Sequence, residues 1–221
     1  MRYTIRMRFL IPAIIANGTH DLEEKIEIVA SHVTWAQIDV MDGTFVRGTS
    51  WPYREGSLDD LMIMKGALKI EAHLMIQNPE RVVAAWALAG VDRIIVHPEA
   101  TEGIGSVMEA LAESRAELGV ALKLGTPIDV IEPWIEDISV VQLMGIEKLG
   151  AHGELFNDAV IKKIAAVRSS YGDITISIDG GVTVLNAPHL LELGVDNLVV
   201  GGAIWNAPDP RAALDQFHTL L

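Results

Sequence analysis

Short apolar segments alternate with segments of helical periodicity along the whole chain, and this alternation constrains the fold more than any other feature. Most of the apolar segments are continuous runs of hydrophobic residues, which is typical of parallel strands covered on both faces. We predict strands at residues 9–15, 35–40, 68–75, 93–97, 120–124, 140–144, 174–179 and 197–200. We predict helices at residues 19–31, 57–65, 79–89, 104–118, 128–136, 157–170, 183–193 and 210–221.

The number of strand–helix units favours a closed barrel. Eight units in 221 residues average fewer than thirty residues each, a spacing that suits βαβ crossovers and a parallel sheet. We therefore predict an α/β fold, a (β/α)8 TIM barrel, with residues 1–221 in a single domain. The alternative is an open doubly wound sheet. Its dinucleotide-binding version is disfavoured because no Gly-x-Gly-x-x-Gly motif follows the first predicted strand.

The charge balance limits the classes of partner. The chain has 30 acidic and 17 basic residues and a formal net charge of −13, which argues against nucleic acid and against an anionic membrane surface. An anionic small molecule would have to be held by backbone donors or by a metal. There is no cysteine, so disulfides and thiol chemistry are excluded and a cytoplasmic location is expected. No apolar run approaches the ~18 residues of a membrane span.

Two aspartates stand at the ends of two apolar strands. Asp39 ends the strand at residues 35–40 and Asp179 ends the strand at residues 174–179. In a barrel the reactive groups gather at the C-terminal ends of the strands. Burying a carboxylate costs several kcal/mol unless something compensates, so two such residues suggest a paired acid and base.

A histidine at the end of a third strand adds a candidate metal ligand. Together with Asp39 and Asp179, His73 could hold a divalent ion, because imidazole and carboxylate suit zinc, iron or manganese. The alternative is that each side chain is satisfied on its own, with His73 bonded to a backbone carbonyl and the aspartates capping turns. Three such residues at one level of three strands favour the metal site.

Glycines and methionines occupy other strand ends. Glycine pairs at the last two strand ends allow a phosphate to approach the backbone, although ordinary turns are the alternative; they are Gly180, Gly181, Gly201 and Gly202. The methionines, which from the residues alone are read as packing, are Met41, Met75 and Met144. We expect His97 and Glu99 only to help build the rim, with no chemical step.

The strand-end motifs, taken in order, resemble those of one known family. They are Ile-Asp-Val-Met-Asp-Gly at 38–43, Ala-His-Leu-Met-Ile at 72–76, Val-His-Pro-Glu-Ala-Thr at 96–101, Lys-Leu-Gly-Thr-Pro at 123–127, Ile-Asp-Gly-Gly-Val at 178–182 and Val-Gly-Gly-Ala-Ile at 200–204. This set is similar to that of ribulose-phosphate 3-epimerases. The resemblance runs from about residue 11 to residue 204 and implies a (β/α)8 barrel that interconverts D-ribulose 5-phosphate and D-xylulose 5-phosphate.

The resemblance also implies roles for individual residues. Asp39 and Asp179 would be the acid/base pair on opposite faces of the sugar, moving the C3 proton through an enediolate. The family holds its divalent metal (Zn, Fe, Mn or Mg) with both aspartates and two histidines, one of which matches His73. The family's methionines beside the enediolate match Met41, Met75 and Met144. Its phosphate-contacting loop after the sixth strand matches residues 148–154, which keep Gly150 and Gly153.

The chain departs from the family pattern at several positions. Gln37 stands where the family has its other metal histidine, and amide oxygen is a poorer ligand than imidazole for zinc-like metals. We expect lowered metal affinity or a shift towards manganese or magnesium. His152 is an alternative nitrogen donor that its distance in sequence disfavours. Ala13 replaces a family serine, and the loop at 148–154 is altered.

These departures leave alternatives to the leading function. One is an epimerase for another phosphoketose, such as a ketohexose 6-phosphate. Another is a phosphosugar-binding barrel without catalysis, against which the retention of both Asp39 and Asp179 argues. The expected partner is a small-molecule sugar phosphate. Family members commonly self-associate, although no apolar stripe in this sequence demands a homo-oligomer.

Overall fold

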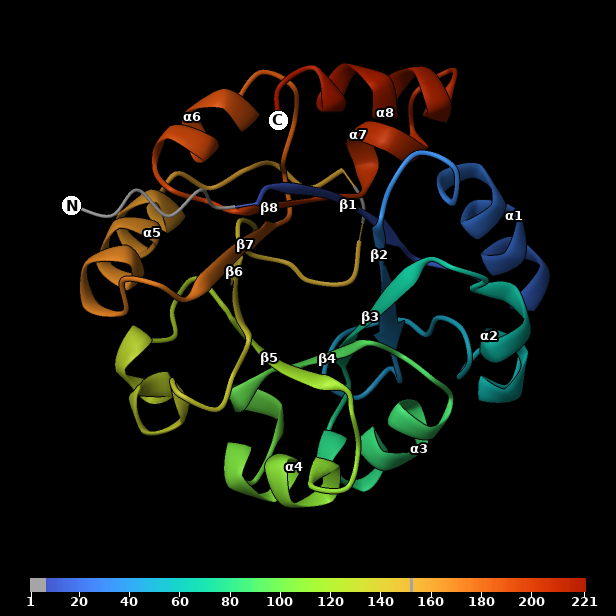
Figure 1. Ribbon diagram of the computed structural model, residues 1–221, viewed down its shortest axis with the longest axis horizontal. Helices are drawn as coiled ribbons and strands as arrows, with labels where there is room; N and C mark the ends of the chain where they lie inside the picture. The colour runs from blue at the N-terminus through green and yellow to red at the C-terminus, as the bar shows by residue number, and fades with distance from the viewer. Residues whose placement is uncertain (1–6, 152) are drawn as a thin grey trace.

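The computed structural model describes residues 7–151 and 153–221, and its eight strands form one closed parallel barrel (Figure 1). Each strand pairs with the next, and β1 pairs with β8 to close the ring. The strands are β1 Phe9–Ile14, β2 Trp35–Met41, β3 Lys69–Met75, β4 Arg93–Val96, β5 Glu117–Leu122, β6 Val140–Met144, β7 Thr175–Asp179 and β8 Asn197–Val200. The predicted (β/α)8 TIM barrel is confirmed.

Helices surround the barrel, and α8 lies beside α1 where the ring of helices closes (Figure 1). The α-helices are α1 Thr19–Val29, α2 Leu58–Met64, α3 Val83–Leu88, α4 Ile104–Leu111, α5 Ala159–Ser170, α6 Ala187–Glu192, α7 Gly202–Trp205 and α8 Pro210–His218. The 3-10 helices in the described part of the chain are η1 Pro79–Arg81, η2 Pro98–Ala100 and η3 Ile128–Trp134. Among the described residues, no helix is both long and apolar enough to cross a membrane.

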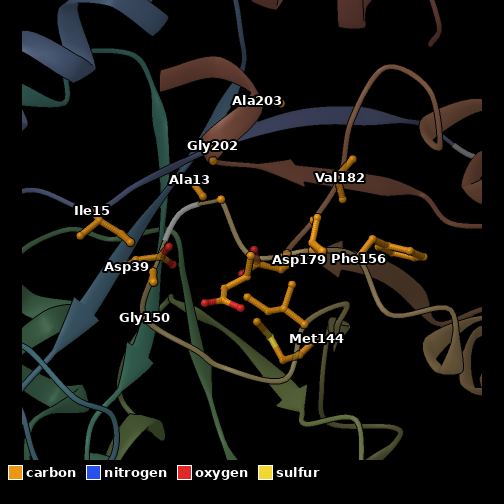
Figure 2. A pocket seen from close by; sticks show the side chains of 18 of the residues that line it. Ala13, Ile15, Asp39, Met144, Gly150, Phe156, Asp179, Val182, Gly202 and Ala203 are labelled. Atoms are coloured by element: carbon orange, nitrogen blue, oxygen red, sulfur yellow. The ribbon is translucent and has the colours of Figure 1, made fainter. Parts of the chain in front are cut away.

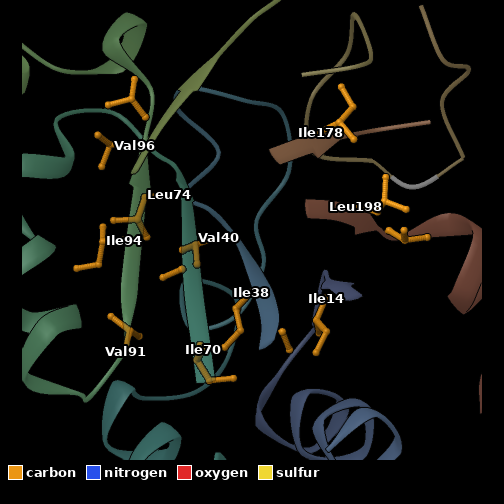
Figure 3. Packing of buried hydrophobic residues seen from close by; sticks show 14 of the residues in the cluster. Ile14, Ile38, Val40, Ile70, Leu74, Val91, Ile94, Val96, Ile178 and Leu198 are labelled. Atoms are coloured by element: carbon orange, nitrogen blue, oxygen red, sulfur yellow. The ribbon is translucent and has the colours of Figure 1, made fainter. Parts of the chain in front are cut away.

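The strands place apolar side chains outside the barrel and a mixed set inside it. Alternate residues of a strand point to opposite faces. Ile38 and Val40 of β2 therefore pack with Leu74 of β3 in the layer between strands and helices (Figure 3). The residues that alternate with them, Gln37 and Asp39, point into the barrel and are buried. The interior thus receives the polar groups of the site.

Two predicted helices were wrong in extent or type. The helix expected at residues 104–118 ends at Leu111, because Glu117 already begins β5 and pairs with Arg93 of β4. The segment expected as a helix at 128–136 forms the 3-10 helix η3, which contains Pro133. A proline inside a helix removes a backbone donor and clashes with the preceding turn, so a regular α-helix is disfavoured there.

Candidate active site

Strand register brings the predicted site residues to one level inside the barrel. Asp39 of β2 lies opposite His73 of β3, and Met144 of β6 lies opposite Asp179 of β7. Only 6% of the Asp39 surface and 7% of the Asp179 surface is exposed, while His73 is fully buried. Both carboxylates are therefore largely desolvated.

The two carboxylates and the imidazole lie close enough to share one ion. His73 Nδ1 is 3.0 Å from Asp39 Oδ1 and 3.4 Å from Asp179 Oδ2. One ligand atom from each of the three side chains lies within 4.8 Å of the others. Burial disfavours the charged imidazole, but the hydrogen bonds to Asp179 and Asp39 outweigh it and raise the pKa of His73 to about 9.

Gln37 lies between these three groups. Its Nε2 donates to Asp39 Oδ1 at 2.7 Å and to Asp179 Oδ2 at 2.9 Å, and it is 3.3 Å from His73 Nδ1. The side chain is fully buried. Its Oε1 has no hydrogen-bond partner among the described residues. The amide therefore faces the carboxylates with its donor group.

A second buried amide, Gln142 of β6, was not predicted. Its Nε2 donates to Asp179 Oδ2 at 2.9 Å, so two amides converge on the same carboxylate oxygen. A sequence signal was present, because Gln142 is the only polar residue in the apolar strand Val140–Met144. A buried amide in such a strand needs a polar partner, and a strand-end carboxylate is an available one.

His97 and Glu99 extend the cluster behind His73. His97 Nε2 lies 2.9 Å from His73 Nε2, and His97 Nδ1 lies 3.3 Å from Glu99 Oε2. Glu99 Oε1 accepts hydrogen bonds from the Thr126 hydroxyl and from the Lys123 backbone, the latter at 3.1 Å. Both His97 and Glu99 follow β4 two residues apart, yet sequence reasoning placed them only on the rim.

Burial and contact set the charge states in this chain of groups. Burial lowers the pKa of the His97 imidazole to about 4, against the opposing effect of Glu99. Burial would raise the pKa of Glu99, but contact with His97 and the Thr126 hydrogen bond lower it to about 2. A neutral His97 can accept a hydrogen bond from His73 through Nε2 only if its own proton is on Nδ1. Glu99 faces that nitrogen and favours this tautomer.

A cavity of about 500 Å³ opens above the two aspartates (Figure 2). Asp39, His73 and Asp179 line it, as do Met75 and Met144. The glycines proposed for phosphate also line it: Gly150, Gly153, Gly180, Gly181, Gly201 and Gly202. None of the described residues lining the cavity is lysine or arginine. An anion in the cavity would therefore depend on backbone donors.

Not every predicted site residue reaches this cavity. Met41 does not line it and is 3% exposed; a Cβ built on Gly150 would lie 2.6 Å from the Met41 sulfur, so Met41 packs beneath that loop. Gln37 is not part of the cavity lining. His152 lies outside the described residues.

The glycine loops after β6, β7 and β8 pack against one another around the cavity. Gly180 and Gly181 have φ values of +101° and +69°, which side-chain-bearing residues rarely adopt. A Cβ at Gly181 would lie 2.6 Å from the Phe156 backbone, and one at Gly202 would lie 2.9 Å from the Gly153 nitrogen. Glycine at these positions lets three loops meet closely, as phosphate-binding loops of barrels do.

The donor set fits a divalent metal at three positions. Asp39, His73 and Asp179 present two carboxylate oxygens and a ring nitrogen, which suit zinc, iron or manganese. Gln37 presents nitrogen to the same point, and an amide nitrogen is not a metal ligand. Its unpartnered Oε1 could serve only after the carboxamide turns over.

Known proteins resemble this one in sequence and in fold. The model of the Ribulose-phosphate 3 epimerase family matches residues 9–205. The chain is 34% identical to ribulose-phosphate 3-epimerase of Bacillus subtilis, covering 82% of this chain and 84% of that protein. It is 31% identical to the enzyme of the same name from Mycobacterium leprae, covering 93% and 91%.

Solved structures of other barrels have the same fold at lower identity. A 3-hexulose-6-phosphate synthase matches with a TM-score of 0.72 and 22% identity, over 96% of this chain and 99% of that one. The 3-hexulose-6-phosphate synthase from Salmonella typhimurium matches with a TM-score of 0.75 and 17% identity, over 96% of this chain and 98% of that one. These structures support the fold. The family match and the sequence identity over most of the chain show which family the chain belongs to. The chain belongs to the ribulose-phosphate 3-epimerase family.

Proposed function

We propose that the protein is an isomerase that interconverts D-ribulose 5-phosphate and D-xylulose 5-phosphate by moving the proton at C3. The observation that carries this proposal is the pair of buried carboxylates, Asp39 and Asp179, brought from β2 and β7 to the floor of one cavity. Family membership and the curated relatives named ribulose-phosphate 3-epimerase support the substrate.

In the proposed reaction each aspartate acts on one face of the sugar. One carboxylate removes the C3 proton, which is α to the C2 carbonyl, and the other carboxylic acid returns a proton from the opposite face. Inversion at C3 requires the two groups to come from opposite sides of the substrate. Asp39 and Asp179 come from β2 and β7, strands that do not pair with each other, and this supports their action from two sides.

The surrounding side chains orient these acids and shield them from water. Gln142 holds one oxygen of Asp179, and His73 contacts both carboxylates. Met75 and Met144 give the cavity apolar walls near the carboxylates, and we propose Met41 as a further support beneath the Gly150 loop. A dry, apolar wall strengthens the electrostatic effect of each carboxylate on a substrate proton.

We propose that Asp39, His73 and Asp179 hold a divalent cation, with the Gln37 oxygen as a weaker fourth donor. When bound, such a cation would supply Lewis-acid stabilisation of the charge that develops on the substrate oxygens. Manganese or magnesium is the preferred ion, since an amide oxygen replaces a histidine nitrogen.

The phosphate is proposed to lie against the backbone of the glycine loops. The residues are Gly150, Gly153, Gly180, Gly181, Gly201 and Gly202, all of which line the cavity. Backbone N–H groups bind phosphate without a basic side chain, which suits a chain with a net charge of −13. Small-molecule metabolism of this kind and the lack of cysteine support a cytoplasmic location.

A second candidate is an epimerase for a longer phosphoketose, such as a ketohexose 6-phosphate. The observation that favours it is the small side chain of Ala13, which stands where the family has a serine, in the lining of the roughly 500 Å³ cavity. A longer sugar would need room beside this position, and the alanine leaves it.

Solvent exchange of the C3 proton tests the proposal. The protein is incubated with ribulose 5-phosphate in heavy water with added Mn²⁺ or Mg²⁺, the metal is removed, and NMR follows loss of the C3 signal and appearance of xylulose 5-phosphate. Exchange with epimerisation supports the leading function. Exchange only with a ketohexose 6-phosphate supports the second candidate. Binding without exchange, unchanged by Asp179→Asn, would overturn both.

A further inference from the structure

The Gln37 side-chain nitrogen lies where a shared cation would lie. It is 2.7 Å from Asp39 Oδ1, 2.9 Å from Asp179 Oδ2 and 3.3 Å from His73 Nδ1. These three side chains are the ones whose ligand atoms lie within 4.8 Å of one another. The Gln37 nitrogen therefore occupies the centre of the donor set rather than its edge.

An amide in this position does part of what a cation would do. The NH2 group carries two hydrogens, one for each carboxylate, so it bridges β2 and β7 across the barrel. Hydrogen bonds to ionised carboxylates are among the stronger ones in proteins. This neutral group therefore holds the two buried carboxylates together in addition to His73, which contacts both.

The opposite end of the same amide explains why the arrangement can change. Gln37 Oε1 is buried and has no hydrogen-bond partner among the described residues. Turning the carboxamide over would place this oxygen against the oxygens of Asp39 and Asp179, which repels unless a cation lies between them. The nitrogen-inward orientation therefore suits the metal-free protein, and the oxygen-inward orientation suits the metal-bound one.

We propose that Gln37 stands in for the cation in the metal-free protein and must turn its carboxamide over before a divalent ion can bind. Metal binding then costs the two hydrogen bonds to the carboxylates and gains a weak oxygen ligand. The metal-free site stays assembled, and the affinity for metal is low. Gln142 differs in one contact: its Nε2 reaches Asp179 at 2.9 Å and His73 Nδ1 at 3.4 Å, but it makes no hydrogen bond to Asp39 and so does not bridge the two acids.

The inference concerns how this chain handles a cation and goes beyond the proposed sugar chemistry. Its test uses the metal alone, without substrate, so its failure is separate from any failure of the epimerase proposal. The full-length protein is treated with a chelator and then titrated with Zn²⁺ or Mg²⁺. Calorimetry gives the affinity, and the side-chain NH2 resonances of Gln37 are followed by NMR.

Three variants sharpen the titration. Gln37→Glu has nearly the same shape but offers only oxygen, and Gln37→His offers a ring nitrogen. Gln142→Glu is the matched control, since it adds the same charge beside Asp179 without occupying the centre of the donor set. We expect both Gln37 variants to bind Zn²⁺ at least tenfold more tightly than the wild type, and Gln37→Glu to exceed Gln142→Glu by a similar factor. Metal-free Gln37→Glu should melt at a lower temperature and recover with metal.

The NMR spectrum of the wild type tests the proposal for Gln37 even if a variant does not fold. We expect the Gln37 NH2 resonances of the metal-free protein to be shifted by their hydrogen bonds and to move on saturation with Zn²⁺. Weak or absent wild-type binding alongside tight binding by a Gln37 variant supports the inference. Zn²⁺ binding that leaves the Gln37 resonances in place overturns it. So does equal affinity for Zn²⁺ in the wild type, Gln37→Glu and Gln142→Glu.

Discussion

The two ends of the barrel interior both bury carboxylates, but they neutralise them differently. At the N-terminal end, Arg93 Nη1 donates to Glu71 at 2.8 Å and Arg93 Nη2 donates to Glu117 at 2.7 Å. The guanidinium also lies 4.3 Å from the Trp35 ring centroid. At the C-terminal end, Asp179 Oδ2 accepts two hydrogen bonds of 2.9 Å from neutral amides, and the cation beside it is His73, a group that can lose its proton.

The difference separates a structural cluster from a reactive one. Arginine is always protonated, so the Arg93 cluster has a fixed cation and cannot pass a proton through it. Amides neither gain nor lose protons at ordinary pH, so Gln37 and Gln142 orient Asp179 without exchanging protons with it. We therefore assign the N-terminal cluster a structural role, while the C-terminal cluster fits the proposed proton transfer.

The largest effect is expected from removing one acid at the reactive end. Asp179→Asn keeps the shape of the side chain but cannot accept the substrate proton, so C3 exchange should fall by roughly 10²–10⁴-fold. The rate is measured by NMR in heavy water, with circular dichroism as the control for folding. A rate within threefold of the wild type would show that Asp179 is not an acid/base group.

The next largest effect is expected at the structural end. Arg93→Met leaves the fully buried Glu71 without its partner, and breaking a buried ion pair costs about 3–5 kcal/mol of unfolding free energy. Urea denaturation measures this loss. The exchange rate per folded molecule should stay near the wild-type value. A large fall in that rate with little loss of stability would reverse the assignment of the two ends.

A pH dependence should also distinguish the structural end. Burial outweighs the attraction of Arg93 and raises the pKa of Glu71 from 4.5 to about 7. The folded protein holds this proton more tightly than the unfolded chain. The resulting stability is fully present below pH 4.5 and is lost as pH rises through about 7.

Replacing Glu71 by an amide should remove this contribution. In Glu71→Gln, the unfolding free energy should fall less between pH 4.5 and 7 than in the wild type, by about 2 kcal/mol. Urea denaturation of both proteins across this range provides the measurement. Parallel pH profiles would contradict the raised pKa.

The smallest effect is expected behind the reactive end, at His97. This residue touches His73 rather than the cavity, so we expect it to position the imidazole. Outer partners of a metal-binding histidine typically contribute 10–100-fold, and His97→Phe should weaken Mn²⁺ binding by about tenfold. Calorimetry with Mn²⁺ measures the change, and Glu99→Gln should give a smaller change in the same direction. Unchanged affinity in both would remove His97 from the site.

The sequence predicted the proposed reactive residues better than it predicted the side chains that contact them. Asp39, His73 and Asp179 stand at strand ends, and closure of the barrel necessarily brings strand ends together. The contacts of Gln142 and His97 were not predicted. Which residues meet across the barrel depends on the register of the strands and on whether each side chain points inwards, and neither is visible in the sequence. The helix predicted at 104–118 was too long for a similar reason. No local signal ends the predicted helix. The strand begins at Glu117 because this residue pairs with Arg93 of β4.

The hydrogen bond from Gln37 to Asp179 joins residues 142 positions apart. Gln37, Asp39 and His73 belong to the first half of the chain, while Gln142 and Asp179 belong to the second. Neither half carries a complete set of reactive groups. If these residues act as proposed, a nascent or cleaved chain is inactive until both halves have docked, and the gain of activity on mixing two half-barrel fragments would report correct assembly.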